Sequence, residues 1–488
     1  MSTLIDQKQT TYYNLINGEW TESSSKELLE SKNPATGEVV GYAQKSTVQD
    51  VEYAIDTVFH AFNTSDWGYN PKRRYNALLG LAQKMEENKE HLARVLTIEQ
   101  GKTINESRGE IAGCIDTLKY FAGASRTVFG RSIQLESQNF GVIAKEPIGV
   151  VGIISPWNWP ALLMVRELAP ALAAGNGVIV KPASLTPAIS VEIFKLFDQV
   201  PDFTKGIVSI VTGPGRSIGA AMGTSKKIDM ISFTGDTSTG KTIMEMATSN
   251  IKKLALELGG KSPNVVFADA NLRKAVPLIG RSIFNTAGQI CMAGSRLLVH
   301  ESIKHEVIAG LKQYAENLEV GNGILETTDM GPVISQSQLD IVSDYIEMGR
   351  KEGKIVTGGY RLTGGEYDKG FFIAPTIIDE LSSSSRVVQE EIFGPVLAIQ
   401  SFSNDEEALA MANDSDFGLA AGVWTTNLNR AMKMSKAIKA GTVWINTYNR
   451  NFPEAEFGGY KQSGQGRTRG IDGLNEYCET KHIHFEID

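Results

Sequence analysis

The sequence contains few cysteine residues. Only three occur among 488 residues, at Cys114, Cys291 and Cys478. An odd and widely spaced set gives no disulfide framework, which is typical of a reducing compartment. No CxxC pair or His/Cys cluster indicates a metal site, and His482 and His484 fit an alternating strand better than zinc. The sequence therefore predicts no metal centre.

Positive charge is not in excess either. The chain carries 48 Lys and Arg against 56 Asp and Glu, which gives a formal net charge of −8. An acidic chain does not attract a polyphosphate nonspecifically. We therefore expect no nucleic-acid partner.

Uncharged runs long enough to span a membrane are lacking, apart from one candidate. Residues 147–165 carry no charge, but Pro156-Trp157-Asn158-Trp159-Pro160 interrupts them. The prolines break a helix, and lipid offers no water to the freed backbone groups. We interpret the run as a buried strand, a sharp turn and a helix. Residues 1–13 are polar and lack the apolar core of a signal peptide, so we expect a cytoplasmic protein without a membrane partner.

The sequence does contain a regular alternation of strand-like and helix-like segments. Short apolar runs bounded by Gly and Pro predict strands at residues 148–154, 177–180, 207–211 and 228–233, with helices at 161–173 and from about Ser184. After Gly259 the pattern predicts strands at 265–267, 296–300, 396–402 and 443–446 and helices at 302–318 and 405–413. This order is typical of βαβ units around parallel sheets, which bind ligands at the carboxyl ends of their strands.

Cys291 is a candidate nucleophile. It lies in Gly288-Gln289-Ile290-Cys291-Met292. Taken alone, a single cysteine is more often a small buried core residue. A thiolate nevertheless attacks a carbonyl carbon well and leaves a tetrahedral adduct more readily than an alkoxide does. A cysteine nucleophile therefore suits acyl chemistry.

Glu257 and Asn158 are two further candidates. Glu257 stands between two leucines and before two glycines, where partial burial would raise its pKa and let it deprotonate water. The alternative is a structural carboxylate in a salt bridge. Asn158, fixed among prolines and tryptophans, could donate an N–H to a developing oxyanion. The alternative is a turn asparagine bonded to its own backbone.

Residues 235–242, Gly-Asp-Thr-Ser-Thr-Gly-Lys-Thr, match the phosphate-binding pattern GxxxxGK[ST]. They follow an expected strand and open an expected helix, so a nucleotide triphosphatase is the main rival interpretation. Asp236 weighs against it, because it places a carboxylate in the loop that would hold phosphates. A strand–glycine–helix turn beside a less charged diphosphate explains the segment equally well. The GxGxxG dinucleotide pattern does not occur.

Taken together, these motifs resemble the aldehyde dehydrogenase superfamily over nearly the whole chain. The motifs that carry the resemblance are Ile16-Asn17-Gly18-Glu19-Trp20, Pro156-Trp157-Asn158, Lys181-Pro182-Ala183-Ser184, Phe233-Thr234-Gly235, Leu256-Glu257-Leu258-Gly259-Gly260-Lys261, Gly288-Gln289-Ile290-Cys291, Glu390-Glu391-Ile392-Phe393-Gly394-Pro395 and Gly458-Gly459-Tyr460-Lys461-Gln462-Ser463-Gly464. Their order and spacing are far more specific than any one of them. That family binds its dinucleotide without GxGxxG.

The resemblance implies a catalytic set and a cofactor site. Cys291 would be the nucleophile, Glu257 the general base, and Asn158 with the backbone N–H of Cys291 the oxyanion hole. NAD or NADP would be bound by Ser155, Trp157, Lys181, Ser184, Gly215, Phe233, Gly235, Gly240, Glu391 and Phe393. The implied reaction oxidises an aldehyde to a carboxylic acid through a thiohemiacetal and a thioester on Cys291, which water activated by Glu257 hydrolyses.

Departures from the family pattern bear on the cofactor. Ser184 stands where many NAD-specific relatives carry a glutamate that binds the ribose 2′-hydroxyl, so the repulsion against a 2′-phosphate is lost. We therefore expect appreciable use of NADP, with Lys181 able to hold either cofactor. Asp236 replaces a common serine near the diphosphate, and an inward orientation would weaken cofactor binding.

Other positions bear on the substrate. Arg166 resembles a tunnel arginine of semialdehyde and lactaldehyde dehydrogenases, but Asn285 stands where the semialdehyde enzymes carry a second arginine. A salt bridge between Arg166 and a neighbouring carboxylate is the equal alternative. Trp159 and Phe457 resemble aromatic tunnel walls and favour a small or medium aldehyde with some apolar surface.

The resemblance also implies the architecture. We expect an α/β fold with a Rossmann-like dinucleotide-binding domain (residues 1–125 and 148–258), an α/β catalytic domain (259–445) and a small β oligomerisation domain (126–147 and 446–488). The edge-like segments 134–145 and 480–486 would join in the last of these and mediate a homodimer or homotetramer. A family member retained as a binding protein and a thioester hydrolase remain alternatives, besides the phosphohydrolase.

Overall fold

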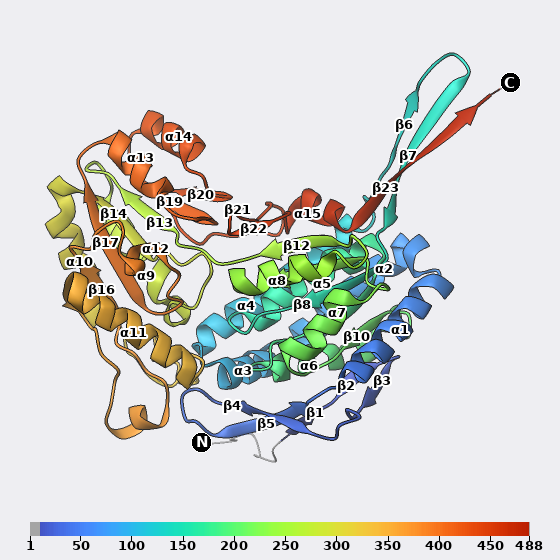
Figure 1. Ribbon diagram of the computed structural model, residues 1–488, viewed down its shortest axis with the longest axis horizontal. Coiled ribbons are helices and arrows are strands. Elements are labelled where there is room, and N and C mark those ends of the chain that lie inside the picture. The colour runs from blue at the N-terminus through green and yellow to red at the C-terminus, as the bar shows by residue number, and fades with distance from the viewer. Residues whose placement is uncertain (1–9, 488) are drawn as a thin grey trace.

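The computed structural model describes residues 10–487, and its strands form sheets that lie in distinct parts of the molecule (Figure 1). The largest sheet has the order β22-β12-β11-β8-β9-β10-β2-β3. Its parallel strands are β8 (Val150–Ile154), β9 (Gly177–Lys181), β10 (Val208–Ile210), β11 (Met230–Thr234) and β12 (Lys253–Glu257). Strands β2 (Asn14–Ile16), β3 (Glu19–Thr21) and β22 (Gly464–Gln465) complete it with antiparallel pairings.

Helices cover both faces of this sheet. Apolar side chains of one strand alternate between two cores, since Val151 and Ile153 pack with one set of helices and Val150 and Ile154 with the other. The first set comprises α2 (Pro71–Glu87), α3 (Lys89–Gln100), α4 (Ile104–Ala124), α5 (Pro160–Ala174) and α6 (Pro187–Lys195). The second comprises α1 (Val48–Thr64), α7 (Ala220–Thr224) and α8 (Thr237–Ala247). Burial on both faces explains the continuous apolar runs of these strands.

The second sheet has the order β15-β16-β17-β14-β13-β19-β20. Its strands are β13 (Pro263–Val266), β14 (Arg296–His300), β15 (Lys354–Thr357), β16 (Thr376–Asp379), β17 (Val396–Phe402), β19 (Ala420–Trp424) and β20 (Thr442–Ile445), and only the β15–β16 pairing is antiparallel among its described strands. Helices α9 (Leu272–Phe284), α10 (Lys304–Glu316) and α11 (Gln336–Glu352) share one core with it, and α13 (Asp405–Asn413) and α14 (Leu428–Ala437) share another.

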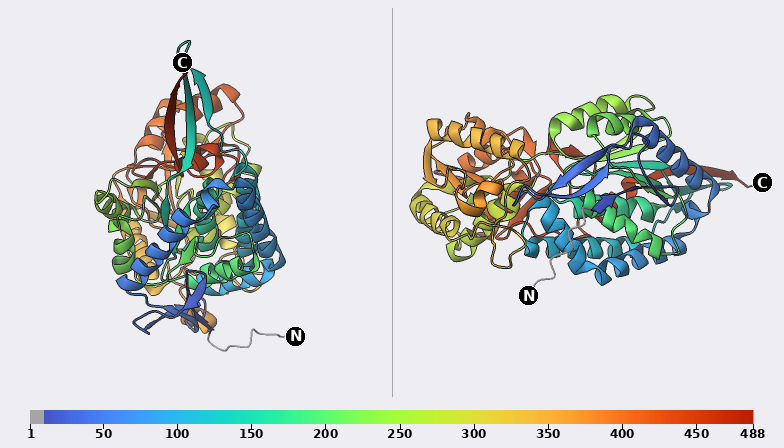
Figure 2. Two further views of the ribbon diagram at one scale, coloured as in Figure 1. Left: turned by 90° about the vertical axis from the view of Figure 1, so that its right-hand side faces the viewer. Right: turned by 90° about the horizontal axis from the view of Figure 1, so that it is seen from below.

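A third sheet projects from the body of the molecule (Figures 1 and 2). It consists of β6 (Arg131–Gln134), β7 (Asn139–Pro147) and β23 (Cys478–Glu486). Strand β23 follows α15 (Gly470–Glu476) and pairs with β7 along its whole length. Smaller pieces are the sheet of β1 (Thr10–Tyr12), β4 (Leu28–Lys32) and β5 (Val39–Gln44), the pair β18 (Phe417–Gly418) and β21 (Tyr460–Lys461), and the short helix α12 (Arg386–Gln389).

The predicted α/β class and the parallel sheets are confirmed. Several boundaries were wrong. The helix expected from Ser184 begins at Pro187, because the Ser184 hydroxyl donates to the Gly213 carbonyl in the loop after β10 and does not cap a helix. The segment 302–318 divides into a 3₁₀ turn and α10, and the hairpin expected at 134–145 spans 131–147. The uncharged run 147–165 contains β8 and the start of α5 as predicted, and no helix among residues 10–487 is long and apolar enough to cross a membrane.

Candidate active site

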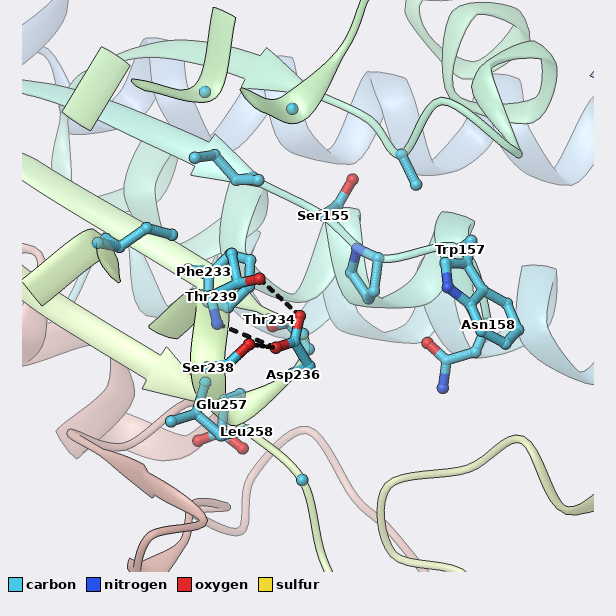
Figure 3. Close-up of a pocket in the computed structure, with 18 of the residues that line it drawn as sticks. Ser155, Trp157, Asn158, Phe233, Thr234, Asp236, Ser238, Thr239, Glu257 and Leu258 are labelled. Carbon is cyan, nitrogen blue, oxygen red and sulfur yellow. Dashed lines mark hydrogen bonds between the residues drawn. The ribbon is translucent and has the colours of Figure 1, made fainter. Parts of the chain in front are cut away.

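A cleft of about 840 Å³ opens at the carboxyl ends of the parallel strands of the first sheet (Figure 3). The loops after β8, β9, β10, β11 and β12 line one side of it, and segments of the second sheet's part of the chain, including Cys291 and Glu391, line the other. The residues from the sequence analysis that line it are Ser155, Trp157, Asn158, Lys181, Gly215, Phe233, Gly235, Glu257, Cys291, Glu391 and Phe393. Residues far apart in the sequence thus meet in one cavity.

Cys291 lines a second cavity as well. This smaller cavity, of about 230 Å³, shares Asn158, Leu163 and Cys291 with the large cleft. The sulfur therefore stands where two cavities meet. Burial raises the pKa of the half-buried Cys291 thiol to about 12, and the nearby Arg166 opposes that rise. In this state the sulfur retains its proton at neutral pH.

The backbone before Cys291 is held in an unusual conformation. Thr286 and Ala287 both have φ of 51°, and Gly288 has φ of 72°. Two hydrogen bonds help to fix this segment: Glu106 Oε1 on α4 accepts from the backbone N–H of Thr286, and the Gln289 side chain donates to the Thr286 carbonyl. Such conformations cost about 1–3 kcal/mol each and cluster at functional sites.

Asn158 is buried and its amide is oriented. Its Nδ2 donates to the Gln289 carbonyl at 2.9 Å, which leaves a second N–H available beside Cys291. The backbone carbonyl of Asn158 accepts from Lys102 Nζ at 2.7 Å, and Lys102 pairs with Glu110 at 2.6 Å. No residue from 10 to 487 accepts a hydrogen bond from the backbone N–H of Cys291. These two N–H groups can receive a carbonyl oxygen that becomes negatively charged.

Glu257 is the last residue of β12 and is only 4% exposed. Its Oε1 has no hydrogen-bond partner among the described residues. Burial raises the pKa of Glu257 to about 8, although Arg166 opposes the rise. The group can therefore exchange a proton with water near neutral pH.

The cleft offers the elements of a dinucleotide site. The buried hydroxyl of Ser155 lacks a partner among the described residues, and Gly215 leaves room beside Lys181, since a Cβ there would lie 3.7 Å from Lys181 Cε. Burial lowers the pKa of Lys181 to about 8, and its Nζ donates to the Pro182 carbonyl. Arg216, which the sequence analysis missed, is an exposed cation on the same wall. An arginine in a turn gives no sequence signal of its own.

Glu391 and Phe393 line the same cleft. Glu391 Oε1 accepts from the Gly260 backbone at 3.1 Å, and any side chain at Gly259 would collide with it. The ring of Phe393 meets that of Trp157 edge to face at 5.2 Å. Gly259 thus leaves space for the Glu391 carboxylate, and the backbone N–H of Gly260 binds it.

Asp236 serves as the N-cap of α8. Its carboxylate accepts from the Thr239 backbone and from the hydroxyls of Ser238 and Thr239 (Figure 3). Lys241 donates to the side chain of Gln462 and does not line the cleft. The phosphohydrolase interpretation of this segment therefore fails, because a carboxylate occupies the amides that would hold phosphates.

Four expected site residues do not line the large cleft or the smaller cavity. Ser184 bonds to Gly213, and Gly240 packs against Leu258. Arg166 forms a buried salt bridge with Glu167 at 2.8 Å and also donates to Thr234 Oγ1, as the alternative interpretation expected. Phe457 is 2% exposed and lies 5.5 Å from the Arg469 guanidinium without lining either cavity, whereas Trp159 does line the smaller cavity.

Comparisons with known proteins agree with this geometry. Residues 20–483 match the model of the aldehyde dehydrogenase family. The chain is 39% identical over 472 residues to a betaine aldehyde dehydrogenase of Bacillus subtilis, covering 96% of each, and 38% identical over 473 residues to an aldehyde dehydrogenase of Davidiella tassiana, covering 97% of this chain and 95% of the relative. A crystal structure of a betaine aldehyde dehydrogenase from Staphylococcus aureus in complex with NAD⁺ superposes with a TM-score of 0.96 at 38% identity, covering 98% of this chain and 95% of that one.

Proposed function

We propose that this chain oxidises its aldehyde through a thioester on Cys291. The chain belongs to the aldehyde dehydrogenase family, and it is an NAD(P)-dependent oxidoreductase that converts an aldehyde into a carboxylic acid. The observation that carries the assignment is the position of the sulfur, which lines both the large cleft and the smaller cavity. The large cleft takes the dinucleotide and the smaller cavity takes the aldehyde.

The first half of the reaction belongs to Cys291 and Asn158. The sulfur gives its proton to solvent water and attacks the carbonyl carbon, so that a C–S bond forms and the carbonyl electron pair moves to oxygen. The free N–H of Asn158 Nδ2 and the backbone N–H of Cys291 stabilise that oxyanion. Bound NAD(P) supplies the acceptor for the hydride that leaves this carbon when the oxygen electron pair returns.

The second half belongs to Glu257. Its carboxylate takes a proton from water, whose oxygen attacks the thioester carbon and displaces the Cys291 sulfur. A pKa of about 8 suits this role, since the carboxylate is partly ionised at neutral pH and its conjugate acid can return a proton.

The residues that would hold the dinucleotide follow from the cleft. Lys181 and Gly215 would hold the adenosine end, and Glu391, Phe393 and Trp157 the nicotinamide end. Two features support use of NADP beside NAD. No carboxylate stands at Ser184, and Lys181 and Arg216 give this end of the cleft two cations. The test is the ratio of kcat/KM for the two cofactors, and a preference of more than about 100-fold for NAD would contradict it.

The same reasoning extends to organisation. We divide the chain into a dinucleotide-binding domain (10–125 and 148–258), a catalytic domain (259–445) and an oligomerisation domain (126–147 and 446–487). Residues 1–9 and 488, which the sequence analysis assigned to the first and last of these domains, lie outside the described residues. The exposed third sheet would mediate a homodimer or homotetramer. The three free cysteines support a cytoplasmic location.

The proposed function is tested by Cys291→Ala. We expect this variant to bind the reduced cofactor with unchanged affinity, as measured by fluorescence. Its rate of aldehyde-dependent cofactor reduction, measured by absorbance, should fall by at least about 1,000-fold because the nucleophile is gone. A matched control is Cys114→Ala, which removes a buried thiol of the first core and should retain activity. Near-normal turnover by Cys291→Ala would refute the assignment.

A further inference from the structure

Arg469 is a buried cation in the smaller cavity. It lies two residues after Arg467, directly before α15, and is 7% exposed. It lines the cavity together with Cys291 and Asn158. Among residues 10–487, none accepts a hydrogen bond from its guanidinium or forms an ion pair with it. The centre of the Phe457 ring lies 5.5 Å from its guanidinium carbon.

The other buried arginines are different. Arg166 pairs with Glu167. Arg74 donates to three backbone carbonyls, and Arg296 donates to the carbonyls around it. Burial of a charge without a partner costs several kcal/mol, so folded chains normally supply one. Arg469 therefore stands out as a buried cation without a hydrogen-bonded or ion-paired partner among the described residues.

The cavity contains nothing that would neutralise this charge. No other described residue that lines it carries a carboxylate or an ammonium group. Two carboxylates outside the lining lie near enough to interact with Arg469, but neither forms an ion pair with it. Glu167 binds Arg166, Tyr477 and Ser232, and Glu257 is the proposed base and lines the large cleft. The cavity is thus mainly apolar, with a single positive charge.

The backbone holds Arg469 in place. Its φ is 62°, a conformation that a non-glycine residue adopts only when its surroundings impose it. Thr468 exchanges two backbone hydrogen bonds with Phe457, and the Arg469 carbonyl accepts from the Gly473 N–H in α15. The guanidinium is therefore presented from a fixed backbone, which lowers the entropy cost of binding a ligand.

We propose that the physiological substrate is an aldehyde with a carboxylate at the end remote from its carbonyl group, and that Arg469 binds this carboxylate while Cys291 attacks the carbonyl carbon. The inference rests on the proposed function. A guanidinium binds a carboxylate through two parallel N–H donors, and the apolar wall between Arg469 and Cys291 accepts a short methylene chain. A substrate with a trimethylammonium group, such as betaine aldehyde, would meet the same charge and be disfavoured.

The experiment compares matched substrates with the whole enzyme and NAD. It measures kcat/KM for the semialdehydes of succinate, glutarate and adipate, for the methyl ester of each, and for betaine aldehyde. We expect at least one semialdehyde to exceed its ester by about 30-fold or more, which corresponds to the lower end of the 2–5 kcal/mol lost when one partner of a buried charge pair is removed. Betaine aldehyde should fall below all the esters.

Variants then assign the preference to a residue. Arg469→Gln should reduce the acid-to-ester ratio by about 30-fold, through KM of the acid more than through kcat. Arg469→Lys keeps the charge and should keep part of the ratio, even if the glutamine variant folds poorly. The matched control is Arg467→Gln, which removes a neighbouring cation that lies outside the cavity lining and donates to the Gly466 carbonyl. It should leave the ratio in place.

The outcomes separate two failures. If no aldehyde is oxidised by the wild-type enzyme, the proposed function itself is wrong. If esters are oxidised as well as the acids, the proposed function stands and the substrate inference is wrong. A ratio that survives Arg469→Gln would also overturn the inference, because another group would then bind the carboxylate.

Discussion

Glu257 combines two influences on one carboxyl group. Burial favours its neutral form, and Arg166 favours its charged form, which leaves the pKa at about 8. The carboxylate acts as a base only when ionised, so its contribution rises as the pH rises through the pKa and is lost below it. At the residue scale, activity is therefore tied to the titration of this side chain.

We expect thioester hydrolysis to increase with pH up to about 8 and then to level off. Glu257→Gln keeps the shape but cannot take a proton, so it should lower steady-state turnover by about 100-fold or more and flatten the pH profile. Stopped-flow absorbance of reduced nicotinamide measures both, because the first turnover should still appear as a burst. A variant that retains the wild-type pH profile would show that another group activates water.

At the element scale, α4 holds both sides of the oxyanion site. Glu106 fixes the loop before Cys291. One turn further along, Glu110 accepts hydrogen bonds from the backbone N–H groups of Ala161 and Leu162 at the start of α5. Glu110 also pairs with Lys102, which donates to the backbone carbonyl of Asn158. Both members of the Lys102–Glu110 pair are fully buried. One helix thus sets the distance between the amide of Asn158 and the sulfur.

Glu110→Gln keeps the hydrogen-bond acceptor and removes the charge. We expect it to lower the free energy of unfolding by about 3 kcal/mol, because Lys102 is left as an unpaired buried cation. It should also lower kcat about tenfold with little change in KM, since Asn158 acts mainly on the transition state. Denaturant unfolding and steady-state kinetics measure the two effects.

The control for this prediction is the double variant Lys102→Met with Glu110→Gln. Removing both charges should recover part of the lost stability, because no uncompensated charge remains. The catalytic loss should persist, since the Asn158 carbonyl has lost its donor. A single variant as stable and active as the wild type would contradict a positioning role for the pair.

At the scale of the whole molecule, the projecting third sheet is the feature that a monomer does not explain. Its apolar side chains Ile483 and Phe485 are 38% and 46% exposed. Its strands β6 and β23 are the two outer strands of the sheet, which leaves their outward backbone groups unpaired within the described chain. Exposed strand edges with apolar side chains are sites of association.

We expect the wild-type chain to be a dimer or tetramer and Phe485→Asp to shift it toward the monomer, because the charge would be buried on association. Light scattering after size-exclusion chromatography measures the mass. The matched control is Ile251→Asp, at a side chain that is 91% exposed on another part of the surface. Equal masses for wild type and both variants would exclude the third sheet as the interface.

The sequence predicted the strands well where burial on both faces demands a continuous apolar run, as in β8 and β9, and it predicted α13 at its observed bounds. The region of Ser184 was harder, because its hydroxyl could cap a helix locally but instead bonds to Gly213, 29 residues further along the chain, which local spacing does not reveal. Arg166 and Arg469 illustrate a deeper limit. Sequence spacing places a residue on an element, but only the packed fold decides which arginine receives a carboxylate from the chain and which faces a cavity.

The central claim is that the acyl group of the substrate becomes attached to the sulfur of Cys291. The most direct test mixes the Glu257→Gln variant with NAD and an aldehyde, stops the reaction with acid within the first turnovers, and measures peptide masses after digestion. The account predicts one acyl group on the peptide that contains Cys291, and none on the peptides of Cys114 and Cys478. Reduced nicotinamide formed without any acyl group on Cys291 would contradict it.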